Sequence, residues 1–132
     1  MGIKVRVDTF DMFQFMKQHG LTTEEISDIV AKAANDGLKI FMQYAPYDTK
    51  NTHNYHSSDF AKISQVRIYP NASYVDIGYL AEDWQWHKQA YFQNYDVSSP
   101  NYHWFNKAQK AIEPVVIAKM EALANQVIAS KN

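Results

Sequence analysis

Two histidines lie in the stretch of the sequence with the most side chains capable of chemistry. The segment 48–59 is polar, rich in His, Asn, Ser and Thr, and holds His53 and His56 at a spacing of three. With a carboxylate such as Asp59, they could bind the metal of a small hydrolase, because zinc takes imidazole and carboxylate ligands. No carboxylate stands at the spacings that zinc hydrolases use. We therefore expect exposed histidines in a polar strand or loop, with no metal and no other cofactor.

The residues that open this segment are better suited to a structural turn than to catalysis. Pro46 lacks an N–H and keeps the residue before it out of the helical region, so a helix that reaches it should end there. Asp48 and Thr49 have short side chains that hydrogen-bond to their own backbone and hold a turn. We assign Pro46, Asp48 and Thr49 to a structural turn. Because the sequence shows no catalytic constellation, we expect a protein that is not an enzyme.

Aromatic side chains crowd the segment 84–105. It holds eight of them, in a chain with nine Tyr, seven Phe and three Trp. Such rings can stack nucleic-acid bases, but single-strand-binding surfaces add a positive groove, and charges balance in this segment. They can also anchor a protein interface, where Trp and Tyr combine contact area with a polar end. We expect about half of the rings in the core and assign an interaction role to Trp84, Trp86, Tyr91 and Tyr95.

Composition narrows the classes of protein that remain. A length of 132 residues predicts one compact domain, residues 1–132. The net charge of −1 gives no reason to expect a nucleic-acid partner. The absence of cysteine excludes disulfides and thiolate metal sites. No apolar run approaches the roughly 18 residues of a membrane helix, and no signal-peptide pattern opens the chain, so we expect no membrane contact.

The element that positions the polar segment is a long amphipathic helix that begins after Thr22. Thr22 and Glu25 form a capping box, and Leu21 and Ile26 are placed as a hydrophobic staple. Acidic, basic and amide side chains occupy one side of the helix. The other side is apolar, with residues at three- and four-residue spacing: Ile26, Ile29, Val30, Ala33, Ala34, Leu38, Phe41 and Met42.

Two shorter elements precede this helix. Residues 3–8 alternate between apolar and charged side chains, the pattern of a half-buried strand. Residues 9–19 can form a short helix, and Gly20 follows it where a left-handed cap is usual. Both elements have one apolar face that must be buried against the rest of the chain.

Three elements follow the polar segment. Residues 63–68 and 75–79 read as a hairpin with its turn at 70–73, and the imperfect alternation of the first strand indicates a bulge. A helix starts near Tyr102, and at Pro114 it should kink or restart. Its continuation has an apolar face that begins with Val115. The order of elements predicts an α+β fold, an antiparallel sheet with long amphipathic helices packed on one side.

This combination of segments resembles a known family. A long helix that ends in Ala-Pro-x-Asp-Thr at 45–49, a hairpin that ends in Val-Asp-Ile-Gly-Tyr at 75–79 and a helix that opens with Trp-Phe-x-x-Ala at 104–108 are similar to the small tail-component family of long-tailed bacteriophages. Its members are head–tail joining or tail-completion proteins. The chain departs from the family pattern at Lys50 and Thr52, where the family usually has Gly and Leu.

The resemblance implies a structural virion protein without chemistry. It would be a neck or tail-completion component that joins head and tail through protein contacts, in a homo-oligomeric ring. Its partners would be other phage neck and tail proteins, with no small-molecule substrate. It would be found in the virion after assembly in the bacterial cytoplasm. The alternatives from the residues alone are a metal-dependent hydrolase that uses His53 and His56, and a single-strand nucleic-acid-binding module.

Overall fold

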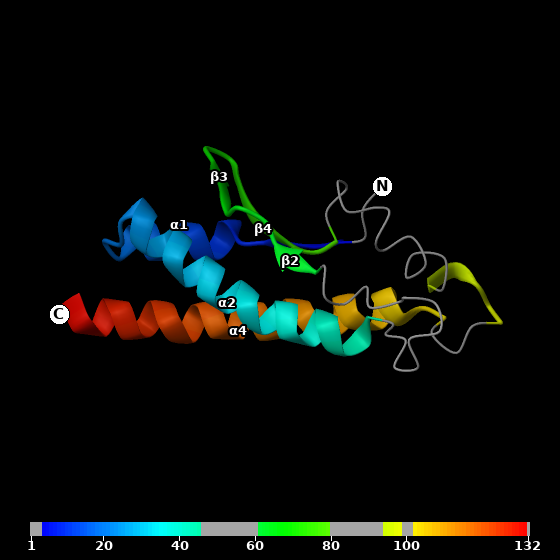
Figure 1. Cartoon of the computed structure of the whole chain (residues 1–132). Coiled ribbons are helices and arrows are strands. Elements are labelled where there is room, and N and C mark those ends of the chain that lie inside the picture. Colours follow the sequence, from blue (N-terminus) through cyan, green and yellow to red (C-terminus); the bar gives the residue numbers. More distant parts are fainter. Residues whose placement is uncertain (1–3, 46–60, 80–93, 99–101, 132) are drawn as a thin grey trace.

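The computed structural model describes residues 4–45, 61–79, 94–98 and 102–131. The predicted α+β fold with an antiparallel sheet is confirmed, and helices pack on one side of that sheet (Figure 1). The elements are, in chain order, β1 (Lys4–Asp8), α1 (Phe10–Gln18), α2 (Thr23–Tyr44), β2 (Lys62–Ile63), β3 (Arg67–Tyr69), β4 (Ala72–Gly78) and α4 (Trp104–Lys131).

Strand β4 is the centre of the sheet. It pairs antiparallel with β1 on one side, from Lys4 opposite Gly78 to Asp8 opposite Tyr74. On its other side it pairs with both β2 and β3. Three residues between β2 and β3 face two residues of β4, so the predicted bulge is present as one extra residue. Ser64 closes the gap, because its N–H donates to the Asp76 carbonyl (2.8 Å) and its Oγ accepts from the Asp76 N–H (2.9 Å).

Helices α2 and α4 form the second layer. They run antiparallel and side by side under the sheet (Figure 1), and Lys131 Nζ at the end of α4 lies 3.0 Å from Glu25 Oε1 at the start of α2. Strands β1 and β4 turn one set of alternating side chains towards these helices. The fully buried side chains of this core include Val5, Val7, Val75 and Ile77 from the strands and Ile26, Val30, Phe41, Ile112, Val116 and Met120 from the helices.

The ends of α2 agree with the sequence signals. Thr22 Oγ1 accepts from the Glu25 N–H (3.1 Å), and Glu25 Oε1 accepts from the Thr22 N–H (2.9 Å), which completes the capping box. Both staple residues are buried. At the other end, Ala45 takes an extended conformation (φ −65°, ψ 137°) before the proline, as predicted. Gly20, with φ of +85°, follows α1 in the left-handed region that was expected for it.

The apolar face of α2 differs from the prediction at two positions. Met42, predicted to face the core, is 40% exposed, whereas Gly37 is buried. A Cβ atom on Gly37 would lie 2.7 Å from Val116 Cγ2 and 2.8 Å from Ile77 Cδ1. The side chains of α4 and β4 therefore leave no room for a Cβ atom at Gly37. Met42 lies one residue beyond the buried Phe41, at the edge of the stripe.

Helix α4 continues through Pro114 without a restart (Figure 1). Pro114 and Lys110, whose carbonyl loses its usual helical donor, are both exposed, so water can replace the missing hydrogen bond. Val115, predicted to face the core, is 39% exposed. The buried side chains of α4 recur at every fourth residue: Trp104, Ala108, Ile112, Val116, Met120 and Ala124.

Candidate interaction surface

Most residues to which the sequence assigned a role lie outside the described part of the chain. Their assignments therefore remain predictions. They are the turn residues Pro46, Asp48 and Thr49, the histidines His53 and His56, and the interaction residues Trp84, Trp86 and Tyr91.

The described part of the aromatic segment divides between core and surface. Trp104 is 3% exposed and makes edge-to-face contacts with Phe41 (centroids 5.5 Å apart) and Tyr79 (6.4 Å). Tyr95, which was assigned an interaction role, is 61% exposed. It follows Asn94, whose side chain accepts from the Phe105 N–H (2.8 Å) and so holds this surface residue near the start of α4.

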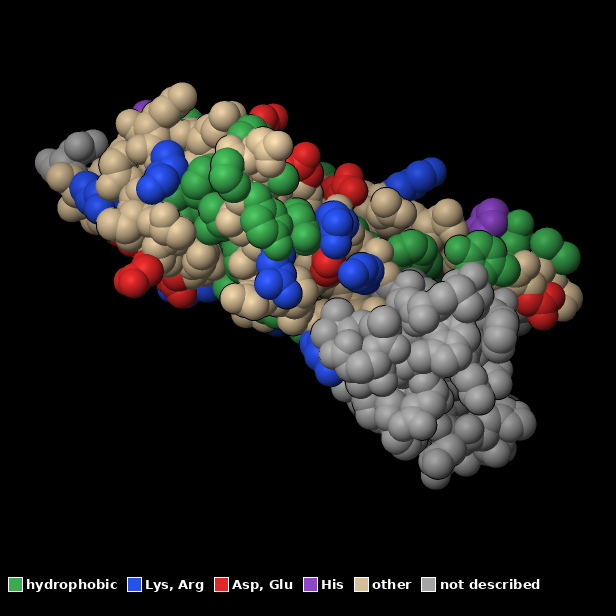
Figure 2. All heavy atoms as spheres, turned by 90° about the horizontal axis from the view of Figure 1, so that it is seen from above, with side chains coloured by type: hydrophobic (Ala, Val, Ile, Leu, Met, Phe, Trp, Pro, Cys, Tyr) green, Lys and Arg blue, Asp and Glu red, His purple; other side chains and the backbone are tan. Residues whose placement is uncertain are grey.

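The sheet turns a second set of side chains away from the helices. Side chains alternate along a strand, so the residues that alternate with the core residues of β1 and β4, together with their register partners on β2 and β3, define this face. It carries charged and aromatic residues. Figure 2 looks down on this face, opposite the helices, and shows hydrophobic side chains gathered beside cationic ones. We call it the outer face, and its members are Lys4, Arg6 and Asp8 of β1, Lys62 of β2, Arg67 and Tyr69 of β3, and Ala72, Tyr74, Asp76 and Gly78 of β4.

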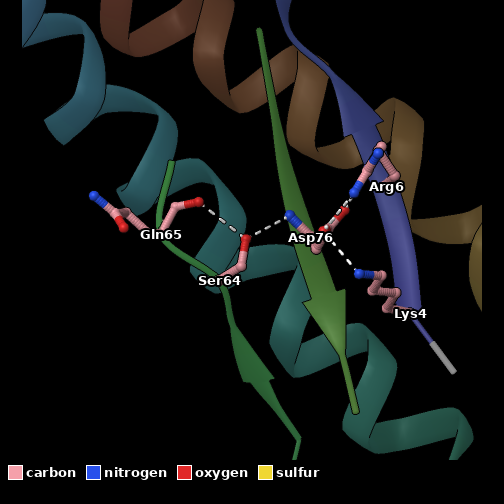
Figure 3. A network of polar contacts seen from close by, with 5 residues as sticks. All are labelled: Lys4, Arg6, Ser64, Gln65 and Asp76. Carbon is pink, nitrogen blue, oxygen red and sulfur yellow. Dashed lines mark hydrogen bonds and ion pairs between the residues drawn. The ribbon is translucent and has the colours of Figure 1, made fainter. Parts of the chain in front are cut away.

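Asp76 is at the centre of a polar network on the outer face (Figure 3). Arg6 donates to it through both arms of its guanidinium, from Nε to Oδ1 (2.8 Å) and from Nη2 to Oδ2 (3.0 Å). Lys4 Nζ lies 3.2 Å from Oδ2. The Asp76 side chain is 7% exposed, against 42% for Lys4 and 53% for Arg6. A buried carboxylate is thus paired with two cations that remain open to water.

This pairing keeps Asp76 ionised at neutral pH. Burial raises the pKa of Asp76, but hydrogen bonds and positive charge from Arg6 and Lys4 outweigh burial, so its pKa lies below the ordinary value. The hydrogen bond to Asp76 raises the pKa of Arg6 in turn. Asp76 and Arg6 are therefore fixed charges at neutral pH.

Two tyrosines extend the network across the sheet. The Arg6 guanidinium carbon lies 3.9 Å from the centroid of the Tyr74 ring, which is a cation–π contact. The Tyr74 ring lies 6.1 Å from the ring of Tyr69, centroid to centroid, on the neighbouring strand. Tyr69 is 46% exposed. The outer face therefore presents a row of an anion, a cation and two rings, in which the outermost ring is open to solvent.

A hollow lies beside this row, at the end of the sheet near the β3–β4 turn. Its volume is about 200 Å³, and its walls include Arg6, Tyr74, Phe10 and Asn71. Asp8 also lines it, with Oδ1 held at 2.9 Å by the Phe10 N–H. Ser73 of β4, which also lines the hollow, forms a buried hydrogen bond of 2.6 Å between its Oγ and Oγ1 of Thr9, the residue after β1. The hollow therefore has apolar and polar walls on a rigid, hydrogen-bonded base.

Sequence reasoning identified the alternation of β1 but missed the outer face as a site. The signal was present in Lys4 and Arg6, which flank the buried Val5. The pairing of Arg6 with Asp76 depends on the register between strands that are 70 residues apart, which local pattern does not determine.

Comparisons with protein-family models, with curated proteins and with solved structures found no match to the chain. Within the described ranges, no group of three or more His, Asp or Glu residues is placed to hold a metal ion. No helix in those same ranges has the length and apolar character needed to cross a membrane.

Proposed function

We propose that the protein is a structural component that acts by binding other proteins. The observation that carries the proposal is the outer face, where Tyr69, Tyr74 and Arg6 are held in place on a rigid sheet. Tyrosine and arginine are enriched at protein interfaces, and they dominate binding energy when a partner buries them. A surface with fixed charges and an exposed ring is suited to recognition rather than to chemistry.

We further propose that this component belongs to the neck or tail of a tailed phage. This part of the proposal rests on the sequence resemblance and on where its motifs lie. The helix stop at Ala45 ends the long helix α2, the segment 75–79 contains the end of the hairpin, and Trp104, Phe105 and Ala108 open α4. The protein would act in the virion, as a homo-oligomeric ring that contacts other neck and tail proteins.

The experiment is a gene disruption in a phage or prophage that encodes the chain. A nonsense mutation in the gene should yield filled heads and tails that remain separate in electron micrographs, and a plasmid copy should restore joined particles. Mass spectrometry of purified wild-type virions should detect the chain. Normally joined particles from the mutant, or virions that lack the chain, would contradict the proposal.

A further inference from the structure

We infer that the outer face binds an acidic segment of a partner protein, and that one hydrophobic side chain of this segment enters the hollow beside the β3–β4 turn. The inference rests on the proposed function, because it names the chemistry of the partner that such a structural protein would contact. Its evidence is the charge of the outer face, the size of the hollow and the arrangement of Arg6 and the tyrosines.

The charge of the outer face is opposite to that of the chain. The chain carries a net charge of −1. With Lys62 set aside, the described outer face has three cationic side chains, Lys4, Arg6 and Arg67, and two carboxylates, those of Asp8 and Asp76. Asp76 is already neutralised by Arg6 and Lys4. Arg67 makes no ion pair with any described residue, so this exposed cation can pair with an incoming carboxylate. Complementary charge of this kind selects an acidic partner and speeds its association.

The hollow is suited to a single side chain. Pockets for drug-sized ligands enclose roughly 300–1,000 Å³, whereas this hollow encloses about 200 Å³. Its aromatic walls, Phe10 and Tyr74, can pack against an aliphatic or aromatic group. Interfaces gain much of their affinity from one such anchor in a pocket, surrounded by polar contacts. Asn71, which also lines the hollow, can provide such a polar contact.

The same geometry favours a protein over a single-stranded nucleic acid. Arg6 uses Nε and Nη2 for its paired hydrogen bonds to Asp76, so these two donors are not available for a bidentate contact with a phosphate. One face of the Tyr74 ring is covered by Arg6, which removes it as a stacking surface. Single-strand binders need a row of open rings in a positive groove. Of the two rings on the described outer face, Tyr69 is exposed and Tyr74 is half-buried.

The test uses fluorescent peptides as probes in anisotropy titrations with the full chain. The main probe is an octapeptide of alternating glutamate and phenylalanine. Three matched probes serve as comparisons. In the first, lysine stands in place of glutamate, and in the second, serine stands in place of phenylalanine. The third is an oligothymidylate with the same charge as the main probe. We expect the glutamate–phenylalanine peptide to bind tightest, and its affinity to fall as salt is raised from about 50 to 200 mM.

Variants locate the binding on the outer face. Tyr69→Ala and Arg67→Glu should each weaken this peptide at least about fivefold. Their controls, Tyr44→Ala and Lys39→Glu, change the same kinds of exposed residue on α2 and should stay within about twofold of the wild type. Ala72→Phe, which places a ring in the hollow, should weaken the glutamate–phenylalanine peptide and leave the glutamate–serine peptide unchanged. Thermal melts of each variant show whether it is folded.

Three results would overturn the inference: no binding of the acidic peptide, tighter binding of the oligothymidylate, or equal losses in the outer-face variants and their α2 controls. If Tyr69→Ala or Arg67→Glu has a clearly lower melting temperature than the wild type, the milder substitution Tyr69→Phe or Arg67→Gln is used in its place. The peptide titrations need no virion, and the gene disruption needs no outer-face variant. Failure of the inference can therefore be told apart from failure of the proposed function.

Discussion

At the scale of single residues, Asp76 links the stability of the sheet to the properties of its outer face. It is the member of the network that is removed from water, and its two cations join β1 to β4. We predict that Asp76→Asn lowers the free energy of unfolding by about 1–2 kcal/mol. The value is at the low end for a charged hydrogen bond, because Arg6 and Lys4 are half exposed and water screens the pair. Urea unfolding measures it, and an unchanged midpoint would contradict it.

The pKa of Asp76 also predicts a dependence of stability on pH. Its pKa is lowered in the folded protein from an ordinary value of 3.8. The unfolded chain therefore takes up the proton first as pH falls, and the stabilisation by Asp76 is complete above about pH 5 and lost as pH falls through the folded pKa. Melts of the wild type and Asp76→Asn between pH 7 and pH 2.5 should show a stability difference that shrinks below about pH 4. A difference that grows towards low pH would refute this assignment.

Gly37 is the second residue whose identity the packing determines. A methyl group there would lie within 2.8 Å of both Val116 and Ile77, in a core with no space to receive it. Alanine is the better helix former by about 1 kcal/mol, but overpacking costs about 1–3 kcal/mol. We predict a net loss of stability for Gly37→Ala in chemical unfolding. The control Asn35→Ala, at an exposed position of the same helix, should be neutral or slightly stabilising, and a stabilised Gly37→Ala variant would show that the two helices can separate freely.

At the scale of elements, the start of α2 is held by its capping box. Thr22→Ala removes the acceptor of the Glu25 N–H and should cost about 0.5–2 kcal/mol. Thr23→Ala is the matched control, because the Thr23 hydroxyl receives only a long hydrogen bond of 3.4 Å from Lys17. In thermal unfolding, Thr22→Ala should have a lower melting temperature than Thr23→Ala. Equal melting temperatures would mean that the cap contributes nothing.

The elements that the sequence predicted well are those with local physical causes. Thr22 with Glu25 starts a helix, Gly20 closes one, and Ala45 before a proline ends one, and each of these signals acts within a few residues. The bulge before β3 was also visible, because the alternation of apolar residues slips by one. Predictions for single positions failed where a neighbouring element decides burial. Met42 and Val115 fit the helical period, but α2 and α4 bury narrower stripes than the apolar residues would allow.

At the scale of the whole molecule, the outer face could not be derived from the sequence. Arg6 and Asp76 meet because β1, near one end of the chain, pairs with β4 in a particular register. The contact of Tyr69 with Tyr74 likewise needs the turn and the register of the hairpin. The interaction residues chosen from the sequence came from aromatic density, and of these the described part of the chain includes only Tyr95. Density of rings in a segment does not separate core from surface, as the burial of Trp104 shows.

The central claim, that the outer face is where this protein meets a partner in an assembled virion, can be tested by site-specific photocrosslinking. p-Benzoylphenylalanine would replace Tyr69 on the outer face or, as the control, Tyr44 on α2, in a complemented phage that encodes the chain. Both positions carry an exposed tyrosine, 46% and 39% exposed respectively. After irradiation of purified particles, position 69 should give a crosslink to another neck or tail protein, and position 44 should give little. Equal crosslinking at the two positions, or no adduct at position 69, would contradict the account.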